Sequence, residues 1–124
     1  MKQEIKERWL KALRSGEYKQ ARKQLRFHDH YCCLGVLCDL HSKETGTQWH
    51  RGSYPHKTGD PDLTYHTITY MKMEGLLPEE VAAWAGISDS DPKISRGEQM
   101  VKLSKLNDDG ASFAEIAELI EEGL

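Results

Sequence analysis

Cys-Cys-Leu-Gly-Val-Leu-Cys-Asp-Leu-His, residues 32–41, is the most apolar run in this chain of 124 residues. Its larger apolar members recur at the spacing of one helix face: Cys33, Val36, Leu37 and Leu40. We therefore predict a central helix over about residues 32–44, with Val36, Leu37 and Leu40 buried. Gly35 costs a helix about 1 kcal/mol relative to Ala, so we expect another element to lie against it.

Amphipathic segments on both sides of this run predict four more helices. Three of them carry recognisable end signals: Gly16 after the first, Pro78 and two glutamates at the start of another, and a Ser112–Glu115 capping box at the start of the last. The expected helices span about residues 3–14, 78–85 and 97–106, and the last one runs on from Ser112.

Short extended segments complete the expected fold. Residues 18–31 favour a small hairpin that turns near Asp29, and residues 63–73 alternate in a β-branched and aromatic context. Residues 47–54 are the expected partner of that strand, whereas most of residues 45–66 has the Gly, Ser, Thr and Pro content of loops. We therefore predict an α+β fold of about five short helices around a small antiparallel sheet.

Composition limits the class of protein. Apolar residues make up 38% of the chain, and three Trp, five Tyr and two Phe supply bulky anchors for a single domain over residues 1–124. No stretch approaches the ~20 apolar residues of a membrane span, and Met1–Lys6 runs into a charged amphipathic segment instead of an apolar signal core. We therefore expect a cytoplasmic protein with no membrane partner.

Charge is divided unevenly along the chain. Residues 1–60 carry 12 Lys and Arg against 7 Asp and Glu, a net +5, whereas residues 61–124 carry 5 against 13, a net −8. Two such halves can complement each other within one fold, pair head-to-tail between the subunits of a homo-oligomer, or present a positive face to an anionic partner. The sequence leaves these three alternatives open.

Three cysteines and one histidine lie close together in the apolar run: Cys32, Cys33, Cys38 and His41. Zn²⁺ takes such ligands, but no Cys-x₂-Cys spacing is present, and adjacent helical residues point about 100° apart. An odd number of cysteines also does not suit a regular disulfide framework. We therefore expect reduced, buried thiols without a metal. A metal site and a Cys–His nucleophilic pair are the alternatives.

A cluster of cations and aromatic rings, in and beside the predicted hairpin, is the strongest candidate for a binding site. Cations hold phosphates, Arg through a planar fork that Lys lacks, and aromatic rings stack on bases. The same mix also suits a solvated hairpin. The candidate ligand-binding residues are Arg22, Lys23, Arg26, His28, His30, Tyr31, Trp49 and Arg51. We expect the loss of Arg26 to weaken binding more than the loss of Lys23.

Motifs for catalysis are missing from the chain. Neither Gly-x₄-Gly-Lys-Ser/Thr nor Gly-x-Gly-x-x-Gly occurs. Paired carboxylates fall at expected helix starts or turns, where they cap backbone donors: Glu79/Glu80, Asp89/Asp91 and Asp108/Asp109. We therefore expect no catalytic residue, no enzyme activity and no cofactor.

Three blocks of sequence stand out as identifiers: Tyr31-Cys-Cys-Leu-Gly-Val-Leu-Cys-Asp-Leu40, Leu77-Pro-Glu-Glu-Val-Ala-Ala-Trp-Ala-Gly86 and Leu106-Asn-Asp-Asp-Gly-Ala-Ser-Phe-Ala-Glu-Ile-Ala-Glu-Leu-Ile-Glu121. In these blocks, about half of its length, the chain resembles a widespread family of small phage and prophage proteins of unassigned function. Residues 45–72 match no pattern of that family. The resemblance implies a viral protein in the cytoplasm of a host cell, where small accessory proteins counter host defences. It carries over no catalytic residues.

These observations favour binding over catalysis. We expect a phage accessory protein that sequesters a nucleotide-type immune signal or blocks a host defence protein. One alternative is a nucleic-acid-binding regulator, which the +5 half favours but the sequence pI of about 6.1 and the missing helix-turn-helix or zinc-finger signature oppose. The other is a thiol- or histidine-dependent nuclease or hydrolase.

Overall fold

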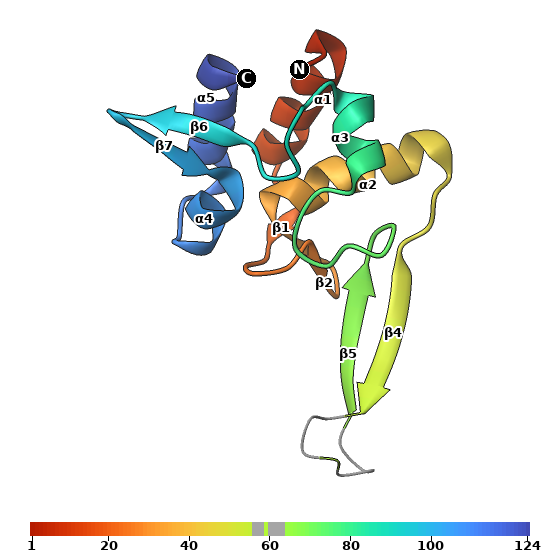
Figure 1. The fold of residues 1–124 in the computed structure, drawn as a ribbon. Helices are drawn as coiled ribbons and strands as arrows, with labels where there is room; N and C mark the ends of the chain where they lie inside the picture. Colours follow the sequence, from red (N-terminus) through yellow and green to blue (C-terminus); the bar gives the residue numbers. More distant parts are fainter. Residues whose placement is uncertain (56–58, 60–63) are drawn as a thin grey trace.

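The computed structural model describes residues 1–55, 59 and 64–124 and confirms an α+β fold (Figure 1). Its helices among these residues are α1 Gln3–Arg14, α2 Cys33–Thr45, α3 Glu79–Ala85, α4 Leu103–Asp108 and α5 Phe113–Gly123. Its strands are β1 Lys19–Gln20, β2 Arg26–Phe27, β3 His30–Tyr31, β4 His50–Pro55, β5 Thr64–Thr69, β6 Lys93–Arg96 and β7 Gln99–Lys102.

The described strands form three separate small sheets instead of the single sheet expected. In the first, β1 runs parallel to β3, and β2 pairs with β3 as the hairpin predicted within residues 18–31. The β4–β5 hairpin opposes Arg51 to Ile68 and Ser53 to His66, and it extends away from the helices in Figure 1. β6 and β7 form the third pair. The first and third sheets have strands of only two to four residues, too short to build a wider sheet.

α2 lies at the centre of the core, as the apolar run predicts. Val36 and Leu37 are fully buried, but Leu40 is only partly buried. Its predicted burial is wrong because α2 runs outward, and Leu40 lies where the helix emerges from the core. A side chain at Gly35 would place its Cβ 1.8 Å from the carbonyl oxygen of Leu25, which confirms the expected close contact.

A buried asparagine joins the start of α2 to β1 and α4. Asn107 is fully buried. Its Nδ2 donates to the carbonyl oxygen of Ala21 (2.7 Å), and its Oδ1 accepts from the backbone N–H of Cys33 (3.2 Å) and from Nε2 of Gln20 (2.9 Å). These bonds hold the first sheet, which carries most of the candidate residues, against the core.

The helix expected over residues 97–106 is wrong. Gly97 has a φ of +66°, which suits the turn between β6 and β7, and the chain becomes helical only at Leu103. Met100, within the segment expected to be helical, is 63% exposed. The cap at the start of α4 comes from a residue outside the helix: the carboxylate of Asp91 accepts from the backbone N–H of Ser104 (3.1 Å).

The remaining boundaries agree more closely. α1 and α3 match the expected helices, and α5 follows Ser112, whose Oγ accepts from the backbone N–H of Glu115 (3.2 Å). β5 ends at Thr69, four residues before the expected end, because φ is positive at the two residues after Tyr70. Leu63, the expected start of that strand, lies outside the described residues. No helix in the described part of the chain is long and apolar enough to cross a membrane.

Candidate anion-binding site

A pocket of about 590 Å³ lies between β2 and the β4–β5 hairpin. We call it the arginine pocket. Four nitrogen-bearing side chains that suit an anion contribute to its wall: Arg26, His28, Arg51 and His66. None of the described residues that line it is acidic. Its wall therefore favours an anionic ligand.

Arg26 is held in place by aromatic rings before any ligand binds. Its guanidinium carbon lies 5.0 Å from the ring centre of Tyr31 and 5.4 Å from that of Trp49. Its Nε donates to the carbonyl oxygen of His28 (2.7 Å). No described residue accepts a hydrogen bond from its two terminal nitrogens or pairs a carboxylate with it. The outer edge of the guanidinium fork is therefore available for a phosphate or carboxylate.

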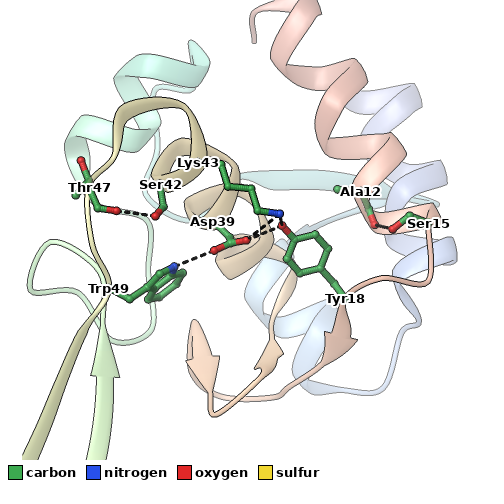
Figure 2. Close-up of polar contacts among 8 residues, drawn as sticks. All are labelled: Ala12, Ser15, Tyr18, Asp39, Ser42, Lys43, Thr47 and Trp49. Atoms are coloured by element: carbon green, nitrogen blue, oxygen red, sulfur yellow. Dashed lines mark hydrogen bonds and ion pairs between the residues drawn. The ribbon is translucent and has the colours of Figure 1, made fainter.

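Asp39 of α2 fixes two aromatic side chains, those of Tyr18 and Trp49, as Figure 2 shows. Trp49 lies against Arg26, and the ring of Tyr18 meets that of Tyr31 edge to face at 5.1 Å. The Asp39 carboxylate is only 9% exposed and accepts from the phenol of Tyr18 (2.6 Å) and from Nε1 of Trp49 (3.1 Å). Lys43 lies beside it, with Nζ 3.5 Å from Oδ2. Burial, and then the hydrogen bond to Asp39, raises the pKa of Tyr18 above its ordinary value, so the phenol keeps the proton that it donates.

The chain that leads from α2 into β4 is also tied down. Oγ of Ser42 donates to the carbonyl oxygen of Thr47 (2.6 Å; Figure 2). The ring of Trp49 then packs between those of Tyr31 and Tyr70, at centre-to-centre distances of 5.9 and 4.8 Å. Trp49 therefore bridges the core and the wall that supports Arg26.

A second pocket, of about 510 Å³, adjoins the first and shares Gln24, Phe27 and His28 with it. We call it the Asp29 pocket. Arg22 and His30 also line it. Oδ1 of Asp29 lies 2.9 Å from Nδ1 of His30. The positive charge of Lys19, 3.6 Å away, lowers the pKa of Asp29, so this carboxylate is ionised at neutral pH.

A family model matches residues 1–124 of the chain. The chain belongs to the family described as "Domain of unknown function (DUF8296)". No curated protein and no solved structure matches it significantly. For this DUF8296 protein, the geometry of the site therefore carries the functional argument.

The structure of this DUF8296 protein brings seven of the eight predicted site residues into one region. Those in the arginine pocket are Arg26, His28 and Arg51, with Tyr31 and Trp49 behind Arg26. Arg22 and His30 line the Asp29 pocket, which His28 also borders. Lys23 lies in neither; it lines a separate hollow, where its backbone N–H donates to Oδ1 of Asp108 (2.7 Å).

Sequence reasoning missed three residues of the site: Gln24, His66 and Asp39. The alternation of residues 63–73 places His66 on the same strand face as Ile68, and both residues pair with β4. This alternation could have pointed to His66 from the sequence. A lone carboxylate in the most apolar run of the chain was the signal for Asp39. For Gln24 no sequence pattern pointed to a role.

The cysteines do not contribute to this site. All three are free and buried. Burial raises the pKa of Cys32 to about 11 and those of Cys33 and Cys38 well above the ordinary value, which makes them poor nucleophiles. Nδ1 of His41 pairs with the phenol of Tyr70 (2.6 Å). Within the described ranges, no group of three or more Cys, His, Asp and Glu could hold a metal ion.

Proposed function

We propose that this protein binds a small anionic ligand of the nucleotide type in the arginine pocket and does not transform it. The observation that carries this proposal is the convergence of Arg26 and Arg51 with two histidines on a pocket that no described acidic residue lines. Because the aromatic wall already orients Arg26, a phosphate binds its fork with little loss of side-chain entropy. Phe27, on the same wall, offers a ring for base stacking.

Sequestration is the role that such a binder would perform. The resemblance to small phage proteins supports a counter-defence setting, in which capture of a nucleotide-type immune signal would disarm the host. The buried, protonated thiols favour binding over thiol-dependent hydrolysis. A host defence protein with an acidic surface is the other partner that this pocket suits.

Calorimetric titration of the purified protein tests the proposal directly. The probes are inorganic pyrophosphate, a panel of mononucleotides and cyclic nucleotides, and short single-stranded oligonucleotides, each at two salt concentrations. We expect nucleotides to bind, with an affinity that falls as salt rises. Analysis of the bound nucleotide after denaturation should recover it intact.

Variants locate the site. Arg26→Ala and Arg51→Ala should each weaken nucleotide binding by about 10- to 150-fold, because each removes a charge-assisted contact worth roughly 1.5–3 kcal/mol. Arg26→Lys should also bind weakly, because Lys keeps the charge but lacks the planar fork. Lys23→Gln is the matched control, since Lys23 is basic and close in sequence but lies outside the pocket.

Three outcomes would contradict the proposal. Wild-type affinity in Arg51→Ala would remove the arginine pocket from the site. Recovery of a cleaved nucleotide would support the hydrolase alternative. Binding to oligonucleotides that strengthens with length, without binding to mononucleotides, would support a nucleic-acid-binding regulator.

A further inference from the structure

The two adjoining pockets differ in the charges that line them. The arginine pocket has two arginines and no acidic residue among its described lining residues. The Asp29 pocket combines one arginine, Arg22, with one carboxylate, Asp29. The first therefore suits a fully ionised phosphate, whereas the second suits a neutral group that has both hydrogen-bond donors and acceptors.

Phe27 and His28 lie at the boundary and belong to the walls of both pockets. Their rings meet edge to face, 4.4 Å apart and inclined by 75°. Phe27 is 49% exposed, so its ring is accessible to a ligand that stacks on it. A flat heterocycle that stacks on Phe27 is within reach of a phosphate in the neighbouring pocket.

We infer that the two pockets form one bipartite site for a guanine nucleotide, with the phosphate in the arginine pocket and the guanine against Phe27 in the Asp29 pocket. This inference rests on the proposed function and names the ligand class. The charges assign the orientation, because the described lining of the arginine pocket has two arginines and no acidic residue, whereas the Asp29 pocket has one arginine and one carboxylate.

Guanine fits the polar groups of the Asp29 pocket better than adenine does. A guanidinium such as that of Arg22 pairs with O6 and N7 of guanine, the commonest specific contact to this base. Asp29 already faces Nζ of Lys19 (3.6 Å) and Nδ1 of His30 (2.9 Å), and the remaining lone pairs of its carboxylate can accept from the N1–H and the exocyclic amino group of guanine. Adenine carries an acceptor at N1, which would face the carboxylate without a proton between them. Gln24, in both walls, adds an amide that can donate and accept.

Four probes in calorimetric titrations of the wild-type protein test this inference: inorganic pyrophosphate, ribose 5-phosphate, AMP and GMP. We expect GMP to bind at least about fivefold more tightly than ribose 5-phosphate, the lower end of what stacking one base contributes. We also expect GMP to bind at least fivefold more tightly than AMP. Equal affinities for GMP and ribose 5-phosphate, or for GMP and AMP, would overturn the inference.

Variants at three exposed positions separate stacking on the base from selection between bases. Phe27→Leu should weaken GMP and AMP binding alike, toward the affinity of ribose 5-phosphate, because Leu keeps an apolar contact but has no π-face. Asp29→Asn should bring the GMP-to-AMP affinity ratio close to one. Arg22→Ala removes a second side chain expected to contact the nucleobase. It should lower the affinity for GMP more than the affinity for AMP. An unchanged ratio in both Asp29→Asn and Arg22→Ala would refute base selection by this pocket.

Failure of the inference can be told apart from failure of the proposed function. Binding of pyrophosphate and ribose 5-phosphate that Arg51→Ala abolishes, with no preference among bases, would retain the phosphate site and reject the guanine site. Absence of binding by all four probes, or GMP binding that Arg51→Ala leaves intact, would reject the proposed function as well. Thermal melts of each variant, compared with the wild type, establish that the fold is retained.

Discussion

At its N-terminal end α2 meets Asn107, whose partners include two backbone groups. Midway along the helix, Asp39 bonds instead to the side chains of neighbouring aromatic residues. The partners of Asn107 include the backbone of Ala21 and of Cys33, on segments far apart in sequence. Those of Asp39 are the phenol of Tyr18 and the indole of Trp49.

The difference separates a polar residue that specifies the fold from one that orients a site. Backbone partners cannot move without displacing the strand or helix that they belong to, so Asn107 acts on the whole chain. Side-chain partners are rings near the surface, so Asp39 acts on the wall behind Arg26. Substitution of Asn107 should therefore mainly reduce stability, whereas substitution of Asp39 should mainly disturb the wall behind Arg26.

Asn107→Ala should have the largest effect on stability. It leaves the buried carbonyl oxygen of Ala21 and the buried N–H of Cys33 without partners, each at a cost of about 1–3 kcal/mol, and opens a cavity. We expect a loss of about 3–5 kcal/mol in urea-induced unfolding. Asp109→Asn, in the same segment but exposed, is the control and should cost less than about 0.5 kcal/mol. Similar losses in the two variants would mean that Asn107 is not a structural hub.

Leu37→Ala measures how much the apolar packing of α2 contributes to the free energy of unfolding. Leu37 is fully buried, so its truncation should cost about 2–5 kcal/mol in the same measurement. Leu40→Ala, one turn closer to the surface, should cost clearly less because its side chain is only partly buried. Equal losses at both positions would mean that Leu40 is buried as deeply as Leu37.

Much of this fold can be predicted from sequence, because local signals mark most element boundaries. Gly16, Gly86 and Ser112 end or begin helices through their own backbone and side-chain chemistry. The wrong prediction of a helix over residues 97–106 has a different origin. There, helix-like spacing coincides with a hairpin, and the cap that starts α4 comes from Asp91, whose approach to Ser104 only the tertiary fold determines.

The site was predictable in its residue types and less so in its geometry. The mixture of Arg, His and aromatic residues predicted Arg26 and Arg51 as candidates, because the chemistry that a phosphate needs is visible in sequence, and the structure brings both to one pocket. The division into two pockets depends on the β4–β5 hairpin packing beside β2, a contact between distant segments. The role of Asp39 likewise depends on which rings the fold brings to it.

Asp39→Asn should have a moderate effect on stability and a distinct effect on titration. An amide can replace only one of the two hydrogen bonds that the carboxylate accepts, so we expect a loss of about 1–2 kcal/mol. Because Asp39 helps to raise the pKa of Tyr18, the titration of Tyr18, followed by ultraviolet absorbance, should move to lower pH in this variant. Tyr18→Phe, which lacks this titration, identifies the residue. An unchanged tyrosine titration would contradict the assignment of Asp39 as the anchor.

His41 follows Asp39 by two residues on α2. It should make the stability of the protein depend on pH. Burial lowers its pKa below the ordinary 6.5, although the nearby carboxylates Glu80 and Glu44 act in the opposite direction. Its neutral ring shares a hydrogen bond with the phenol of Tyr70. Burial raises the pKa of that phenol. The unfolded chain therefore takes up a proton on this residue at higher pH than the folded protein does.

The sign of the effect follows from this difference. The contribution of neutral His41 is complete above about pH 6.5 and is lost as pH falls through the lowered pKa of the folded state, with a slope of at most about 1.4 kcal/mol per pH unit. Urea melts between about pH 7.5 and pH 5 stay above the range in which most carboxylates titrate. We expect His41→Gln to flatten this dependence and the exposed control His50→Gln to leave it unchanged. If the slope persisted in His41→Gln, the pH sensitivity of stability would lie in other residues.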